Sequence, residues 1–89
     1  MAKYSLRIKK SAAKELAAIA IKVDRQRIIK RIESLRENPR PKGAIRLSGS
    51  ERYRIRQGNY RILYTIEDRA LIIYVIKIGD RKAVYKTRA

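Results

Sequence analysis

The chain has 89 residues, of which 24 are Lys or Arg and 8 are Asp or Glu, so its formal net charge is +16. It contains no Cys and no His, which excludes disulfides and metal sites built on thiolate or imidazole, and leaves carboxylate, Tyr, Lys or water for acid–base chemistry. Such a surplus of cations costs compactness through self-repulsion and favours a polyanionic partner, nucleic acid first and an acidic protein second.

The length fits one domain, which we expect to span residues 1–89. The N-terminus lacks the apolar core of a signal peptide, and the longest apolar run, residues 70–76, is too short to cross a bilayer. We therefore expect a soluble, cytoplasmic protein without a membrane partner.

The first half of the chain predicts a strand followed by two helices. Tyr4, Leu6 and Ile8 alternate with polar residues, as is typical of a strand with one buried face. Apolar residues then recur at helical spacing after two candidate N-caps, Ser11 and Asp24. The apolar positions are Ala12, Leu16, Ile19, Ala20 and Val23 in the first helix, and Ile28, Ile32 and Leu35 in the second.

The second half of the chain predicts strands, which begin after the second helix ends. The second helix should end by Asn38, because Pro39 disfavours the α conformation in the residue before it. Residues 44–47 form at most a short extended piece, and residues 71–78 are expected to form the last strand.

Between these segments, residues 52–57 and 60–66 alternate as two strands around Gly58-Asn59, a dipeptide that suits a two-residue hairpin turn. The resulting order, β-α-α-β-β-β, predicts an α+β fold of two layers. In this fold a helical hairpin packs on one face of a mainly antiparallel four-stranded sheet.

The hairpin register predicts a cluster of arginines. If Gly58-Asn59 is the whole turn, Arg56 lies directly opposite Arg61, and opposed residues share a face. One face then carries Tyr53, Ile55, Ile62, Tyr64 and Ile66, whereas the other carries Arg52, Arg54, Arg56 and Arg61. Like charges in direct opposition destabilise a hairpin by about 0.2–1 kcal/mol, a cost that an anionic ligand would reverse.

Any one of these arginines alone would be explained by solvation of the outer sheet face. Four together favour a functional explanation, because guanidinium groups hold their donors in a planar fork that matches phosphate oxygens. Such groups also neutralise the charge that grows during phosphoryl transfer. The sequence therefore predicts a phosphate-binding site on the hairpin.

The segment IGDRKAVY, residues 78–85, follows the last strand. Arg81 and Tyr85 are four residues apart and share a side only if the segment turns helically. Tyr85 has an ordinary explanation, packing on the sheet, and a functional one as a base. Nearby cations favour phenolate, and each unit by which the pKa falls increases the ionised fraction about tenfold.

Three stretches in this order carry a family resemblance: ENPRPKG, RLSGSERYRIRQGNYRILY and VIKIGDRKAVY. Together they closely resemble the toxins of the RelE branch of the RelE/ParE superfamily, over essentially the whole chain. This resemblance implies a ribosome-dependent mRNA endonuclease, the toxin of a type II toxin–antitoxin pair, which cleaves mRNA in the ribosomal A site. The 2′-hydroxyl would attack the adjacent phosphate and leave a cyclic phosphate and a free 5′-hydroxyl, without a metal or another cofactor.

The resemblance also implies roles for residues and partners. Tyr85 would be the general base or would orient the 2′-hydroxyl, and Arg81 would act at the leaving oxygen. The phosphate and the substrate backbone would be held by Arg54, Arg56 and Arg61, with Arg52 on the same face. The partners would be a cognate antitoxin, the ribosome with its 16S rRNA, mRNA, and operator DNA only through the antitoxin complex.

Two departures from the family pattern bear on proton transfer. Some relatives have lysine where Arg54 and Arg56 stand, and arginine is a poor proton shuttle because it stays protonated. Many relatives have histidine in place of Asp80.

A ParE-like inhibitor of DNA gyrase and a non-catalytic RNA-binding module remain as alternatives. The first is disfavoured by the retention of Arg81 and Tyr85, and the second would need the arginines but not Tyr85.

Overall fold

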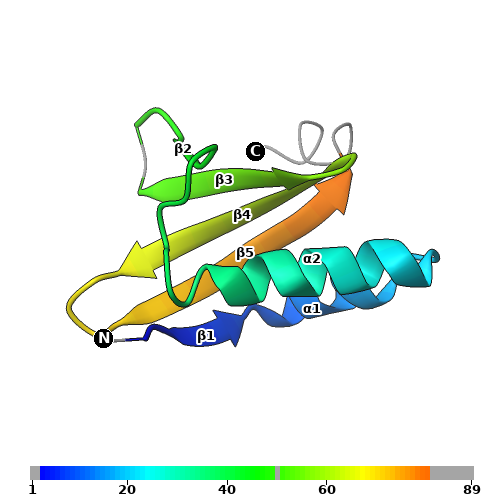
Figure 1. Ribbon diagram of the computed structural model, residues 1–89, viewed down its shortest axis with the longest axis horizontal. Coiled ribbons are helices and arrows are strands. Elements are labelled where there is room, and N and C mark those ends of the chain that lie inside the picture. The colour runs from blue at the N-terminus through cyan, green and yellow to red at the C-terminus, as the bar shows by residue number, and fades with distance from the viewer. Residues whose placement is uncertain (1–2, 50, 81–89) are drawn as a thin grey trace.

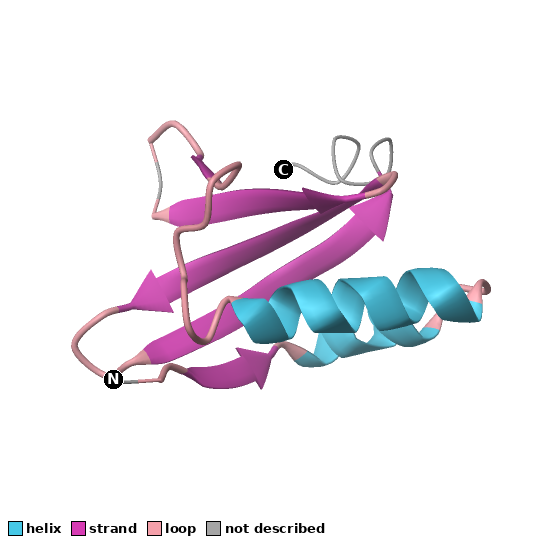
Figure 2. Cartoon of the chain, viewed as in Figure 1, coloured by secondary structure: helices cyan, strands magenta, loops and turns pink. Residues whose placement is uncertain are grey.

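A computed structural model of the chain describes residues 3–49 and 51–80, and it consists of two helices laid across one face of a sheet (Figures 1 and 2). The predicted site residues Arg81 and Tyr85 lie outside the described residues. In chain order the elements are β1 Ser5–Ile8, α1 Lys10–Ala17, α2 Lys22–Ser34, β2 Ile45–Arg46, β3 Arg52–Gln57, β4 Tyr60–Glu67 and β5 Ile72–Asp80.

The sheet has five strands in the order β1-β5-β4-β3-β2, which corrects the expected number of four. The additional strand is β2, whose Ile45 and Arg46 pair antiparallel with Arg54 and Tyr53 of β3. The α+β class with two layers is confirmed, and so is the mainly antiparallel pairing, since only β1 and β5 run parallel. Strand β1 is therefore one edge of the sheet and β2 the other.

The helix starts differ from the two predicted N-caps. Lys9 precedes α1 and Ile21 precedes α2 as the N-cap residues, and neither makes a side-chain capping hydrogen bond. Ser11 lies inside α1. Asp24 lies in the first turn of α2, where a negative charge interacts favourably with the exposed N–H groups of the helix start. Val23, assigned by its spacing to the first helix, belongs to α2 and is 50% exposed.

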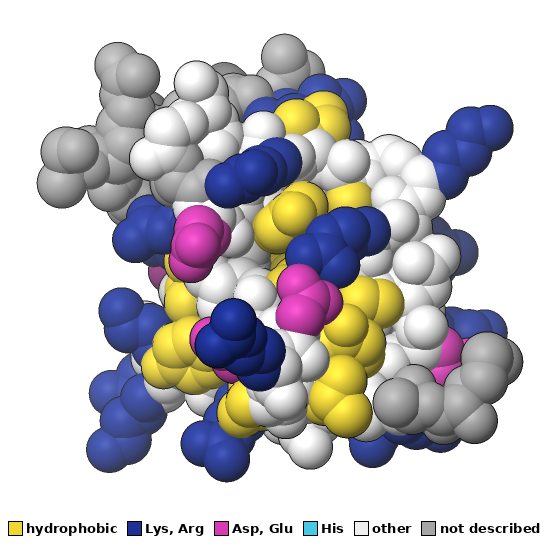
Figure 3. Space-filling model, turned by 90° about the vertical axis from the view of Figure 1, so that its left-hand side faces the viewer, with side chains coloured by type: hydrophobic (Ala, Val, Ile, Leu, Met, Phe, Trp, Pro, Cys, Tyr) yellow, Lys and Arg dark blue, Asp and Glu magenta, His cyan; other side chains and the backbone are white. Residues whose placement is uncertain are grey.

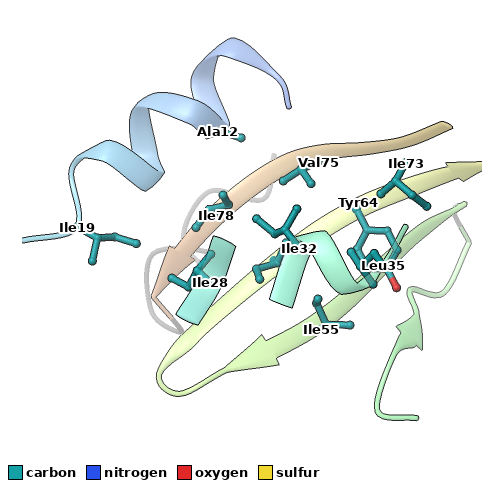
Figure 4. Close-up of a cluster of buried hydrophobic side chains, with 11 residues drawn as sticks. Ala12, Ile19, Ile28, Ile32, Leu35, Ile55, Tyr64, Ile73, Val75 and Ile78 are labelled. Carbon is teal, nitrogen blue, oxygen red and sulfur yellow. The ribbon is translucent and has the colours of Figure 1, made fainter. Parts of the chain in front are cut away.

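The core lies between the helices and the inner face of the sheet (Figure 4). Helix α2 contributes Ile28 and Ile32, and its C-cap residue Leu35 follows them; these side chains are at most 1% exposed. The sheet contributes Ile55, Ile62, Tyr64, Ile73, Val75 and Ile78. Burial of each aliphatic side chain of this size is worth about 1.5–3 kcal/mol. In the described part of the chain, neither helix is long and apolar enough to cross a membrane.

Helix α1 protects the free edge of β5. Strand β1 ends at Ile8, so the edge of β5 beyond Val75 has no neighbouring strand. The Glu15 carboxylate of α1 accepts a hydrogen bond from the backbone N–H of Ile78 at 3.1 Å and pairs with the ammonium of Lys77. A row of N–H groups that would otherwise invite another strand is thus partly satisfied by a side chain.

A polar network fastens the loop after α2 at the other end of the sheet. The Arg40 guanidinium donates to both carboxylate oxygens of Asp68, at 2.8 and 3.2 Å, and to the Tyr53 hydroxyl at 3.1 Å. The Tyr4 hydroxyl donates to Asp68 at 2.7 Å. We call these four residues the loop latch, because they join the loop after α2 and the N-terminal segment to β3 and the turn between β4 and β5.

The loop latch makes stability depend on pH in one direction. Hydrogen bonds from Arg40 and Tyr4 lower the pKa of Asp68 from its ordinary value of 3.8. A carboxyl whose folded-state pKa is depressed contributes stability above its unfolded pKa, and this contribution is lost as the pH falls through the folded pKa. We expect Asp68→Asn to lower the free energy of unfolding at neutral pH, and this difference to vanish in acid well below pH 3.8.

Urea unfolding of both proteins at the two pH values measures this difference. Glu67→Gln is the matched control, since Glu67 is a neighbouring exposed carboxylate and forms no ion pair among the described residues. A loss of stability in Asp68→Asn that is equal at both pH values would contradict the electrostatic role of Asp68.

Candidate phosphate-binding site

The predicted register of the hairpin is confirmed. Arg56 of β3 lies directly opposite Arg61 of β4, and Gln57 lies opposite Tyr60. The inner face is also as predicted, with Ile55 and Ile62 paired and fully buried under the helices. Because side chains alternate along a strand, the arginines project from the opposite face of the sheet.

The turn that sets this register is formed by Gly58 and Asn59. Gly58 has a φ of +60°, a conformation that side chains with a Cβ rarely adopt, whereas Asn59 is not among the residues with positive φ. Positive φ at the first central residue alone is the pattern of a type II′ turn, whose twist matches that of the flanking strands. Gly58 therefore holds Arg56 and Arg61 in direct opposition.

The two opposed arginines differ in exposure. Arg56 is exposed, whereas only 3% of Arg61 is accessible to solvent, and Arg61 is the one charged residue buried in the described part of the chain. A guanidinium withdrawn from water interacts more strongly with an anion than an exposed one, because solvent no longer screens it. The opposition of the pair was predictable from the register, but the burial of Arg61 was not expected.

A small cavity of about 90 Å³ opens beside this pair. It is lined by Arg56, Gly58, Asn59, Tyr60 and Arg61, so the two opposed arginines and the tight turn border the same space. Charge-assisted hydrogen bonds from two such groups to one phosphate would be short and strong. The arrangement can bind a phosphate and stabilise added negative charge on it.

The other two predicted arginines lie further along β3. Arg54 is half-buried, and its Nε is buried without a hydrogen-bond acceptor among the described residues. Arg52 is exposed and pairs across the ladder with Thr65. At about 3.3 Å per residue, the backbone of Arg52 is about 13 Å from that of Arg56. Arg52, Arg54 and Arg56 thus form a row along β3 that suits successive phosphates of a chain, with Arg61 beside Arg56 on β4.

Strand β5 ends beside the hairpin tip. Tyr60 pairs with Asp80 and Arg61 with Gly79, so the last described residue lies at the same end of the sheet as the cavity. The roles expected for Arg81 and Tyr85 lie outside the described residues and stay predictions.

Two described tyrosines are poor candidates for the general base. Burial raises the pKa of Tyr64 to about 12, and its hydroxyl donates to the Pro39 carbonyl oxygen at 2.8 Å. The hydrogen bond to Asp68 raises the pKa of Tyr4 as well. Both phenols are therefore ionised less readily than a free tyrosine near neutral pH.

Tyr60 and Gln57 flank the hairpin turn, and both were missed as candidate site residues. Tyr60 lines the cavity beside Arg61, and Gln57 lies opposite it in the ladder. Their position next to the turn was the available signal, because residues that flank a two-residue turn surround the same tip.

Across residues 3–49 and 51–80, no group of three Asp or Glu side chains is placed to hold a metal ion.

Comparison with known proteins identifies the family of this chain. A family model described as the ParE toxin of the type II toxin–antitoxin system parDE matches residues 6–85. No match was found among curated protein sequences.

Solved structures of RelE proteins match nearly the whole chain. One chain of the archaeal RelE–RelB complex from Pyrococcus horikoshii OT3 is 27% identical, with a TM-score of 0.79 and coverage of 98% of this chain and 99% of that one. Isolated E. coli RelE is 28% identical, with a TM-score of 0.75 and coverage of 93% and 92%. A mutant E. coli RelE in complex with the antitoxin peptide RelBc is 31% identical, with a TM-score of 0.68 and coverage of 97% and 93%. With a family match over residues 6–85 and a shared fold, this chain belongs to the RelE/ParE superfamily of type II toxin–antitoxin toxins.

Proposed function

We propose that this toxin is a ribosome-dependent endonuclease that cleaves mRNA in the ribosomal A site and thereby stops translation. The observation that carries the proposal is the pair of arginines across the hairpin, of which Arg61 is buried and Arg56 is exposed beside the same cavity. The similarity to RelE structures supports the same activity.

The reaction needs a phosphate held between cations. The 2′-oxygen attacks the adjacent phosphorus, the bond to the 5′-oxygen of the next nucleotide breaks, and a 2′,3′-cyclic phosphate and a 5′-hydroxyl result. One proton leaves the attacking hydroxyl and one reaches the leaving oxygen. Arg61 and Arg56 would stabilise the charge on the phosphoryl oxygens, which is where preorganised donors have their largest effect.

The remaining roles follow from the family resemblance. Tyr85 takes or orients the proton of the 2′-hydroxyl, and Arg81 acts at the leaving oxygen. Arg54 and Arg52 hold neighbouring phosphates, in keeping with their spacing along β3. The partners in this proposal are mRNA, the ribosome with its 16S rRNA, and a cognate antitoxin, for which the solved RelE–RelB complexes provide the precedent. Operator DNA is contacted only through the antitoxin complex, and the site of action is the cytoplasm.

Inhibition of DNA gyrase is the second candidate, because the matching family model is described as the ParE toxin. A gyrase inhibitor would cleave no RNA, and it would have no use for a phosphate cavity bordered by two arginines. The two functions are separated by one experiment.

That experiment is primer extension on an mRNA in a purified translation system. We expect new 5′-ends within the reading frame only when ribosomes and the toxin are both present. The control is the same mRNA without ribosomes, together with a supercoiling assay on purified gyrase. Inhibition of gyrase without any new mRNA ends would overturn the proposal in favour of the second candidate.

A further inference from the structure

A groove beside α2 continues the hairpin site around the tip of the sheet. Its lining consists of Arg27, Lys30, Arg31 and Ser34 of α2 and Gln57 of β3, and its volume is about 350 Å³. We call it the α2 groove. The three cations recur at helical spacing, so they share one side of the helix and border the same space.

The α2 groove is connected to the hairpin cavity by a third hollow. This middle hollow, of about 110 Å³, is lined by Asp24 and Arg27 of α2 and by residues 57–60 of the hairpin. It shares Arg27 and Gln57 with the α2 groove, and Gly58, Asn59 and Tyr60 with the hairpin cavity. The three hollows therefore adjoin one another through shared residues, and we call the series from the hairpin cavity to the α2 groove the path.

The charge along this path is strongly positive. Its described lining contains Arg27, Lys30, Arg31, Arg56 and Arg61 and one carboxylate, that of Asp24. Among the residues with described positions, no acidic side chain forms an ion pair with Arg27, Lys30 or Arg31. Clustered cations without counter-charges repel one another, and an anionic chain lying in the groove would remove that cost.

The opposite end of the molecule has a different character. Figure 3 shows that acidic and hydrophobic side chains are interspersed with the cations there. The loop latch with its Asp68 carboxylate is part of this end, at the turn between β4 and β5. At that end acidic side chains therefore interrupt the positive charge, whereas Asp24 is the one acidic residue in the described lining of the path.

We propose that the α2 groove is a second phosphate-binding subsite, and that single-stranded RNA held at Arg56 and Arg61 runs around the hairpin tip into it. This inference rests on the proposed function. A stiff duplex cannot follow a path that bends around a two-residue turn, but a single strand can. Tyr60, half-buried between two of the hollows, offers a ring on which a base can stack.

The test measures binding of a short single-stranded RNA, 2′-O-methylated throughout so that it cannot be cleaved, over a range of salt concentrations. The groove variant combines Arg27→Gln, Lys30→Gln and Arg31→Gln. The control variant removes the same charge elsewhere through Arg7→Gln, Lys42→Gln and Arg69→Gln, three exposed cations away from the path. Thermal unfolding and circular dichroism verify that both variants are folded.

We expect the groove variant to bind the RNA at least about tenfold more weakly than the control variant. The slope of log affinity against log salt concentration should be shallower for the groove variant than for the unaltered protein by about 2. Three phosphate contacts are lost in the groove variant, and each contact on a single strand contributes about 0.7 to the slope. Asp24→Asn should have the opposite effect and strengthen binding, a result that misfolding cannot imitate. Equal affinities of the groove and control variants for RNA would overturn the proposal.

A second probe distinguishes an acidic protein partner from RNA. If the groove variant loses affinity for polyglutamate but not for the RNA, the groove belongs to an acidic polypeptide and the inference fails. The proposed function fails separately, if the unaltered protein produces no ribosome-dependent mRNA cuts. In that case the groove variant would still bind RNA more weakly than the control variant, and the subsite would stand alone.

Discussion

Arg61→Gln should lower the rate of ribosome-dependent mRNA cleavage by about 10²–10³, because it removes a preorganised donor from the charge that develops on the phosphate. The effect should be larger than that of Arg56→Gln. Both residues border the same cavity, but Arg61 is 3% exposed whereas Arg56 is exposed to water that screens its charge. Single-turnover cleavage of ribosome-bound mRNA at saturating toxin measures the two rates.

Arg61→Lys tests whether charge alone suffices. Lysine keeps the positive charge but loses the planar fork that can donate two parallel hydrogen bonds to a phosphate. We expect Arg61→Lys to recover only part of the lost rate, with a fold that circular dichroism shows to be intact. Lys42→Gln is the control for loss of one positive charge, since Lys42 is exposed in the loop after α2. A folded Arg61→Gln protein with an undiminished rate would remove the hairpin pair from the reaction.

The hairpin could be predicted from the sequence because two local signals agree there. The alternation of residues 52–57 and 60–66 shows which side chains face the core, and Gly58 allows the tight turn that pairs Arg56 with Arg61. A slip of one residue would move Ile55 and Ile62 out of the core. The register, and with it the order of the site residues, therefore follows from local sequence.

The features that were missed depend on what lies next to each element in space. The burial of Arg61 and the hollows beside α2 depend on the three-dimensional arrangement of the chain, which periodicity does not contain. Helix α1 starts after Lys9 although Ser11 is the better capping residue, because the N–H of Lys9 bonds to the Val75 carbonyl oxygen of β5 and the chain turns there. Strand β2 has only two residues, too few for alternation to be recognised.

Tyr85→Phe should reduce the rate of cleavage by about 10²–10⁴, the usual contribution of a general base. The substitution keeps the aromatic ring and removes only the hydroxyl, so any packing of the ring is retained. The expected change lies in the rate at saturating toxin, while the toxin concentration that gives half the maximal rate stays the same. A binding role would raise that concentration and leave the maximal rate unchanged.

Tyr74→Phe is the matched control for Tyr85→Phe. Tyr74 is 38% exposed on β5, where it pairs with Arg7 of β1 and Thr65 of β4, away from the hairpin tip. Because Tyr74 borders none of the three hollows, loss of its hydroxyl should leave the cleavage rate unaltered. Burial raises the pKa of Tyr64 to about 12 and a hydrogen bond raises that of Tyr4, so neither phenol is suited to replace Tyr85 as a base. Full activity of Tyr85→Phe would therefore transfer proton abstraction to Tyr60, which lines the cavity, or to a lysine, a carboxylate or water, because the chain has no histidine or cysteine.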